Sequence, residues 1–464
     1  MFKTLANVFR IPELRNKILF TLFMLMIYRV GYHVPIPGVD QTNFEQLEKK
    51  QQQGGEDTAA GRLANYVSLF SGGNLSQSTI FGLGVMPYIS ASIIFQLLGT
   101  VVPALEKMQK EGEQGRKKIQ EWTRYATVPL CVIQAIFWLQ YMHQSSPPLV
   151  QRTFANMPMF WTMGILSLTA GCIFLMWLGE QIDEYGLGNG VSLIILAGIV
   201  ARMPQAILML IQQTNFSAQP NAAKPLTLFS VIMLFAAFVF IVAGSILITQ
   251  AQRRIPIQQA KHTRGRKIYG GARQYLPLRV NHGGVMPIIF AQSLMLFPGV
   301  ALGWLAGMFP QSNVIGFLNA EFGRTGFIYI MTEVIMIYFF AYFWTTVQFQ
   351  PKEMANQLRD YGSFVPGLRP GKRTADYLEK VMMRITYVGA AFLCVIAVVP
   401  TAMNSALGIP FQITAFLGGT GLLIVVSVAL DMVQRIEANL LMRNYGGFLS
   451  GPGQKGKRIK GRQY

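Results

Sequence analysis

The sequence predicts an all-α polytopic membrane protein with ten transmembrane helices. Its 464 residues are 52% hydrophobic and only 13% charged, and the mean hydropathy of +0.35 is far from a soluble globular average. Ten apolar stretches recur along the chain, each about as long as a helix must be to cross a hydrocarbon core. Basic residues also concentrate in alternate connections between these stretches, as membrane topology requires.

The ten predicted spans alternate with hydrophilic connections from one end of the chain to the other. They run at about residues 18–34, 84–104, 124–142, 155–179, 187–211, 226–250, 284–308, 327–347, 385–403 and 411–431. Most of the 40 Lys and Arg residues lie at the two ends and in the second, sixth and eighth connections. By the positive-inside rule these parts are cytoplasmic, and an even number of spans brings both termini to that side. The net charge of +19 therefore reflects topology and anionic headgroups, which argues against nucleic-acid binding.

Two of the basic connections, residues 251–283 and 348–384, are large and mixed in composition. Both interleave basic residues with β-branched, aromatic, Pro and Gly positions. This mixture predicts folded hairpins or short helices that stand off the membrane and can dock a large acidic partner. A solvated, lipid-facing run of charge is the alternative.

The segment before the second span contains an apolar stretch that is too short to cross the membrane. Residues 62–70 could form two or three helical turns before 71–74, Ser-Gly-Gly-Asn, interrupts them. Because non-helical backbone at membrane depth must be buried in protein or line a cavity, this pattern favours a re-entrant element. An outside loop with a surface helix is the alternative.

Several long motifs along the chain together resemble the SecY family of protein-translocating channels. In order they are Tyr-Arg-Val-Gly at 28–31, Pro-Ile-Pro-Gly at 35–38, residues 84–94, Gly-Asn-Gly at 188–190, residues 252–256 and 276–281, Val-Pro-Gly-Leu-Arg-Pro-Gly at 365–371, and residues 418–424. The resemblance covers nearly the whole chain. It implies two five-helix halves, spans 1–5 and 6–10, related by an in-plane pseudo-two-fold axis. The odd number of spans in each half supports this inverted arrangement independently.

The resemblance also implies an hourglass pore that opens sideways between the second and seventh spans. The pore-ring positions carried over are Val85, Ile89, Ile195, Ile199, Ile289 and Ile424. An apolar ring repels water when empty and yields around a passing chain. Residues 62–80 correspond to the family's plug, with Tyr66, Leu69, Phe70, Gly72, Gly73 and Asn74 at its centre and Gly72, Gly73, Gly82 and Gly84 as expected hinges.

Two polar residues match the family's lateral gate. These are Gln96 in the second span and Asn281 at the start of the seventh. An ordinary interhelical hydrogen bond would also explain Gln96, and Asn281 could cap its helix. On the cytoplasmic side, Arg264, Arg266, Lys267 and Arg369 match surfaces that engage the SecA motor or the translating ribosome.

The resemblance implies a protein-conducting channel of the bacterial cytoplasmic (inner) membrane. It would translocate unfolded secretory polypeptides and release membrane segments sideways into lipid. The expected partners are SecE and SecG homologues, SecA, the ribosome, signal sequences with their nascent polypeptides, and anionic lipids. The predicted regions are 1–250 (spans 1–5, plug segment 62–80, an inter-half connection near 212–225, and span 6), docking loop 251–283, spans 7–8 at 284–347, docking loop 348–384, spans 9–10 at 385–431 and a basic tail at 432–464.

No enzymatic activity, cofactor or metal is expected. Cys131, Cys172 and Cys394 all lie in predicted spans, which favours packing over disulfides or metal ligands. Arg29 and Glu333 lie toward the outer ends of spans, where snorkelling or mutual pairing is expected for Glu333 and a structural role for Arg29. The rival interpretations are a secondary transporter, which would need ionisable residues near the midplane, and an intramembrane enzyme, which would need a converging catalytic set.

Overall fold

The computed structural model describes most of the predicted spans and both large basic connections. The described residues are 11–40, 79–144, 149–150, 158–215, 226–259, 262–264, 267–269, 273–309, 312–322, 326–407, 409, 413–414 and 419–449. The central residues of the predicted plug, Tyr66 to Asn74, lie outside them.

Each of the ten predicted spans overlaps a helix. The helices are α2 (Pro12–Gly31), α5 (Met86–Val101), α6 (Pro103–Lys110), α7 (Glu113–Gln144), α8 (Pro158–Tyr185), α9 (Gly190–Gln213), α10 (Leu228–Gln250), α11 (Met286–Met308), α12 (Asn313–Glu321), α13 (Phe327–Gln348), α14 (Pro351–Asp360), α15 (Lys372–Leu407) and α17 (Thr420–Leu449). By length and composition alone, five helical segments of the described chain could cross a membrane. They are Pro158–Tyr185, Gly190–Gln213, Leu228–Gln250, Phe327–Asp360 and Lys372–Leu407, and Met86–Gly99 is a shorter apolar helix.

Several helices run past the boundaries predicted for the spans. α7 starts at Glu113 and α15 at Lys372, inside the connections expected before them, and α17 continues through the expected tail to Leu449. With 36 residues α15 is about 54 Å long, well beyond a hydrocarbon core of about 30 Å. The second span instead ends early, because Val102 is extended before Pro103 and the chain restarts as α6.

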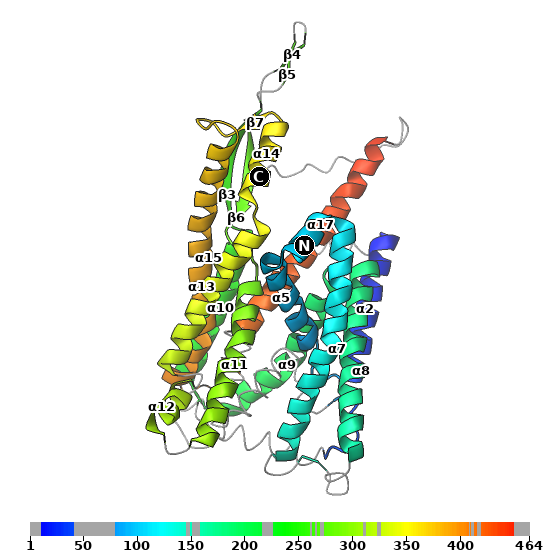
Figure 1. Ribbon diagram of the computed structural model, residues 1–464, viewed down its shortest axis with the longest axis vertical. Helices are drawn as coiled ribbons and strands as arrows, with labels where there is room; N and C mark the ends of the chain where they lie inside the picture. The colour runs from blue at the N-terminus through cyan, green and yellow to red at the C-terminus, as the bar shows by residue number, and fades with distance from the viewer. Residues whose placement is uncertain are drawn as a thin grey trace.

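The two basic connections fold as the composition predicts, into strands and a short helix. β3 (Gln252–Gln259) pairs antiparallel with β6 (Arg273–Arg279), and β7 (Ser363–Phe364) adds to the other edge of β3. β4 (His262–Arg264) and β5 (Lys267–Tyr269) form a hairpin that projects at the top of Figure 1. β1 (Thr214–Asn215) and β2 (Leu226–Thr227) form a separate parallel pair. We call the end that carries β3–β7 and α14 the basic end.

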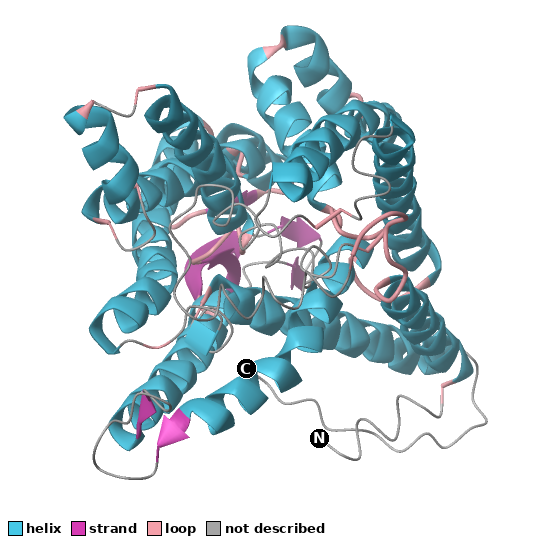
Figure 2. Cartoon of the chain, turned by 90° about the horizontal axis from the view of Figure 1, so that it is seen from below, coloured by secondary structure: helices cyan, strands magenta, loops and turns pink. Residues whose placement is uncertain are grey.

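The helices that overlap the predicted spans form two groups with the same packing order. In the first group α5 packs on α7, α7 on α8, and α2 on α8. In the second, α11 packs on α13, α13 on α15, and α10 on α15. The groups meet chiefly where α9 packs against α17, and both contribute to one large hydrophobic cluster. Seen from below, the helices lie around the periphery of the molecule (Figure 2). The repeated order is that of two related five-helix halves.

Candidate functional site

The structure brings all six predicted ring residues into the same hydrophobic cluster. Val85, Ile195, Ile199, Ile289 and Ile424 are buried, each no more than 5% exposed, and Ile89 packs against them half-buried. These side chains come from α5 and the turn before it, α9, α11 and α17. Residues from four helices and both halves therefore converge, and all of them are aliphatic. Such a set can exclude water but offers no group for acid, base or nucleophilic chemistry.

The two helices predicted to flank the lateral opening begin in the same way. Gly-Val-Met-Pro occurs at 84–87 before α5 and again at 284–287 before α11. Gly84 and Gly284 have φ of +57° and +58°. The amide N–H of Ile89 donates to Val85 O at 3.0 Å, and that of Ile289 to Val285 O at 3.2 Å. We call residues 79–85 and 279–285 the leading turns of α5 and α11.

Each leading turn is docked on a glycine of a helix in its own half. A Cβ on Gly171 of α8 would lie 2.2 Å from Ile80 O, and a Cβ on Gly389 of α15 would lie 2.9 Å from Val280 O. Only glycine allows backbone to approach this closely. The turns therefore occupy equivalent places in the two halves, and they carry Ile89 and Ile289 into the cluster at equivalent places as well.

The leading turn of α5 is also the described end of the predicted plug segment. Thr79 bridges to Pro35, and the amide of Ile80 donates to Val34 O at 3.0 Å. The Phe81 ring stacks between Tyr28 of α2 and Phe174 of α8, with centroid distances of 6.3 and 5.8 Å. Two of the expected hinge residues, Gly82 and Gly84, thus lie in a buried, hydrogen-bonded turn.

The two predicted gate residues make bonds within their own segments. Gln96 Nε2 donates to Ser92 Oγ at 3.4 Å, one turn earlier in α5, and the buried Gln96 Oε1 has no hydrogen-bond partner among the described residues. Asn281 Nδ2 donates to Gly284 O at 2.9 Å. Asn281 therefore braces the leading turn of α11, whereas the residue at the N-cap of that helix is Val285.

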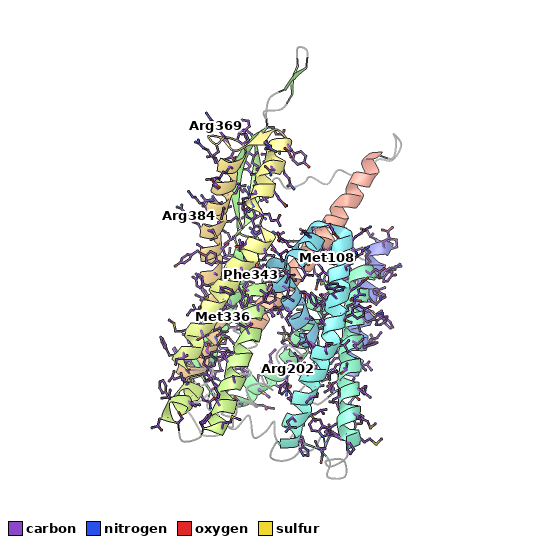
Figure 3. The ribbon with its side chains drawn as sticks, in the orientation of Figure 1. Met108, Arg202, Met336, Phe343, Arg369 and Arg384 are labelled. Carbon is purple, nitrogen blue, oxygen red and sulfur yellow. The ribbon has the colours of Figure 1, made fainter. Side chains whose placement is uncertain are left out.

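The basic end presents the predicted docking residues on two structures. Arg264 and Lys267 face each other in the register of the β4–β5 hairpin, although their side chains and all of Arg266 lie outside the described part. Arg369 is exposed at the tip of a turn (Figure 3), where its carbonyl accepts a 2.9 Å bond from Thr374 Oγ1. Gly367 and Gly371 flank it with φ of +84° and +109°, so the turn depends on both glycines.

Of the two ionisable residues inside predicted spans, Arg29 and Glu333, only Glu333 lies differently from what is expected. Glu333 was expected to snorkel or to pair with Arg29, but it is 3% exposed in α13, with Gln292 of α11 as a partner. Its side chain points into the protein because α11 supplies an amide there, so snorkelling is wrong. Arg29 is exposed and lies over the Tyr32 ring, 4.2 Å from its centroid.

Neither Gln292 of α11 nor Thr420 of α17 was singled out from the sequence. In the structure Gln292 bonds both Glu333 and Thr420. Gln292 Nε2 donates to Glu333 Oε1 at 3.3 Å, and Gln292 Oε1 accepts from Thr420 Oγ1 at 3.4 Å. A polar signal was present, because Gln292 lies deep in an otherwise apolar stretch at 284–308. The repeat of Gly-Val-Met-Pro would have directed attention to the residues that follow it.

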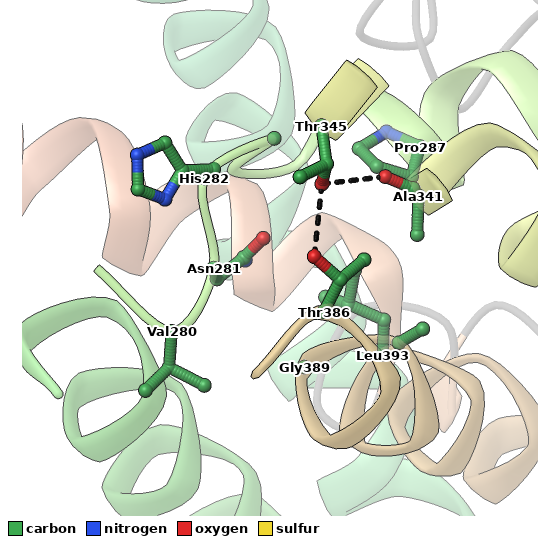
Figure 4. Close-up of a pocket in the computed structure, with 11 residues that line it drawn as sticks. Val280, Asn281, His282, Pro287, Ala341, Thr345, Thr386, Gly389 and Leu393 are labelled. Atoms are coloured by element: carbon green, nitrogen blue, oxygen red, sulfur yellow. Dashed lines mark hydrogen bonds between the residues drawn. The ribbon is translucent and has the colours of Figure 1, made fainter. Parts of the chain in front are cut away.

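A small pocket lies between the leading turn of α11 and helices α13 and α15 (Figure 4). Thr386 Oγ1 of α15 donates to Thr345 Oγ1 of α13 at 3.1 Å, and Thr345 in turn donates to Ala341 O at 2.8 Å. Asn281 and His282 close the other side.

The three cysteines, Cys131, Cys172 and Cys394, are buried, as expected of packing residues.

Comparisons with known proteins identify the family of the chain and support its fold. The family model for SecY matches residues 79–433. A protein translocase subunit SecY from Thermotoga maritima is 39% identical over 463 residues and covers 100% of both chains. A solved SecY structure, in which the plug domain stabilises the closed translocation channel and maintains a membrane seal, matches with a TM-score of 0.60 at 17% identity, covering 94% of this chain and 95% of that one. Sec61 of the canine ribosome–channel complex from the endoplasmic reticulum matches with a TM-score of 0.58 at 17% identity over the same shares. With a family match over most of its length and a full-length relative at this identity, the chain belongs to the SecY family.

Proposed function

We propose that this chain is the protein-conducting channel subunit of a translocase. The observation that carries the proposal is the convergence of six aliphatic side chains from both halves in one buried cluster. Wetting such a constriction is costly, yet branched aliphatic side chains can move apart around a passing polypeptide. A secondary transporter could also be built from inverted repeats, but the relatives of this chain are translocase subunits.

The test is to place an amide in the proposed constriction. Ile424→Asn and Ile289→Asn should raise the ion conductance of idle channels in planar bilayers and favour substrates with weak signal sequences, because wetting the closed ring becomes cheaper. Ile337→Asn is the matched control, since Ile337 of α13 is fully buried in the same cluster but lies outside the proposed ring. Currents are normalised to folded protein. Idle currents equal to wild type would remove Ile289 and Ile424 from the pore.

The finer steps extend this proposal. Unfolded secretory polypeptides would pass the ring, and membrane segments would leave between α5 and α11, with Gln96 and Asn281 at the seam. Residues 62–80 would act as the plug under the ring, as the plug domain does in the related SecY structure. The buried leading turn of α5 supports this assignment, because it gives that segment a firm attachment next to Val85.

The basic end would face the cytoplasm of a bacterial cell and engage a SecA motor or a translating ribosome. SecE and SecG homologues would complete the channel, and all ten spans would cross the membrane. Exposed Arg253, Arg254, Arg279, Lys352 and Arg369 at this end support an acidic partner. The canine relative is found in a ribosome complex.

Orientation and docking can be tested separately. Single cysteines at positions 265 and 369 should be labelled only from the cytoplasm and one at position 52 only from outside, and the reverse pattern would overturn the orientation. Arg369→Glu should weaken motor or ribosome binding by about 1 kcal/mol and reduce its salt dependence without affecting membrane insertion. Unchanged binding and salt dependence would remove Arg369 from the docking surface.

A further inference from the structure

We propose that Gln292 is a positioning residue that ties α11 to α13 and α17 and so holds Ile289 and Ile424 in the closed arrangement of the ring. The inference rests on the proposed channel function. It concerns three side chains that the pore ring does not use. They are Gln292, Glu333 and Thr420, each from a different helix of the second half.

One amide joins all three helices. Its nitrogen donates to the Glu333 carboxyl at 3.3 Å and its oxygen accepts from the Thr420 hydroxyl at 3.4 Å. Glu333 is only 3% exposed, so its carboxyl depends on partners within the protein. Each end of the amide therefore satisfies a polar group on a different neighbour.

The tie lies beside the proposed constriction. Gln292 follows Ile289 by three residues on α11, and Thr420 precedes Ile424 by four residues on α17. Residues at these spacings are neighbours on one face of a helix. The Gln292–Thr420 bond therefore fixes the two ring-bearing helices relative to each other about one helical turn from their ring residues.

Movement of α11 away from α13 or α17 must break one or both bonds. A half-buried amide and a buried carboxyl then each lose a partner within the protein. The tie favours the closed arrangement of the ring. Its contribution can be measured as the rise in idle conductance when its bonds are removed.

The experiment compares idle conductance and translocation of a weak-signal substrate in full-length channels, normalised to folded protein. Gln292→Leu removes both bonds and should raise idle conductance about threefold to tenfold, since each interhelical bond in a membrane contributes modestly. Thr420→Val removes one bond with little change in shape and should give about half that effect on a logarithmic scale. The double variant should match Gln292→Leu alone, because the Thr420 bond is already lost there.

Thr332→Val is the matched control. Thr332 neighbours Glu333 in α13, but in the described part of the chain its hydroxyl donates to Ile328 O of its own helix, at 2.7 Å. Its substitution should leave idle conductance unchanged. If Gln292→Leu folds poorly, Thr420→Val decides the matter.

Measuring Ile289→Asn and Ile424→Asn in parallel separates the proposed tie from the proposed pore ring. The ring variants could raise idle conductance while Gln292→Leu and Thr420→Val give the same conductance as Thr332→Val. That result would refute the proposed tie and leave the proposed pore ring supported. Additive effects of Gln292→Leu and Thr420→Val would also overturn a single shared tie. If neither ring variant changes conductance, Ile289 and Ile424 do not line the pore and the inference fails with them.

Discussion

Helices α5 and α11 start alike and are then held differently. Both follow a Gly-Val-Met-Pro turn and both bring an Ile into the central cluster. Three residues after that Ile, α5 has Ser92 and α11 has Gln292. Ser92 accepts from Gln96 of its own helix, whereas Gln292 bonds α13 and α17.

The difference shows how a repeated fold can attach equivalent helices differently. The described hydrogen bond between Gln96 and Ser92 stays within α5. The longer amide of Gln292 spans the distance between helices. If the two helices form the sides of a lateral opening, α11 is fastened to its own half by the two bonds of Gln292, whereas the described bond of Ser92 joins α5 to no other helix.

The largest expected effect concerns the docking of the leading turns. Gly171→Ala should destabilise the protein by about 2–3 kcal/mol, because the new Cβ would meet the Ile80 backbone at 2.2 Å. Gly389→Ala should cost about 1 kcal/mol, because its contact with Val280 O is 2.9 Å. Thermal unfolding of the purified variants in detergent measures both.

A glycine on the same helix provides the control for this comparison. The three atoms nearest to a Cβ on Gly164 are side-chain carbons of Leu139, the closest at 2.8 Å, and a side chain shifts more easily than backbone. Gly164→Ala should therefore lower the melting temperature less than Gly171→Ala. Equal losses would show that backbone contact at the leading turn is not special.

A smaller loss of stability is expected when Gly84 or Gly284 is replaced. These glycines have positive φ and lie near the ends of the two leading turns. Gly284→Ala should cost about 1–2 kcal/mol, since φ of +58° disfavours a Cβ while no atom lies within 4 Å of it. Gly84→Ala should cost at least as much, because Gly84 is buried. Gly284→Asn should recover part of the loss in thermal stability, since Asn tolerates this backbone conformation. Equal stability of the Ala and Asn variants would contradict the backbone explanation.

The smallest effect tests whether α13 is also tied to α15. Thr386→Val removes the bond to Thr345 and should cost about 0.6 kcal/mol. Thr401→Val is the control on α15, because Thr401 is buried but bonds Val398 O of the same helix. Chemical unfolding monitored by Trp fluorescence can resolve the pair. A loss no greater than that of the control would show that the Thr386–Thr345 bond adds little to the attachment of α13 to α15.

Much of the architecture was predictable because hydrophobic length and charge bias are local properties of a chain. All ten apolar stretches became helices, and the connections rich in Pro, Gly and aromatic residues became strands and α14. The convergence of Val85, Ile199 and Ile424 required the family resemblance, since an isolated Ile gives no sign of which neighbours it meets. The start of α15 was misjudged because its first turns, including Leu378 and Val381, pack in a hydrophobic cluster with Ile255 of β3 and Leu278 of β6.

The sequence by itself determined that the chain is helical and membrane-bound, which end is basic, and that two helices share a Gly-Val-Met-Pro start. These follow from composition, periodicity and the few backbone conformations that glycine and proline allow. Only the tertiary structure decided that Glu333 is buried and that Gln292 reaches two helices. A polar side chain can face lipid, water or another helix, and packing between distant segments selects among them.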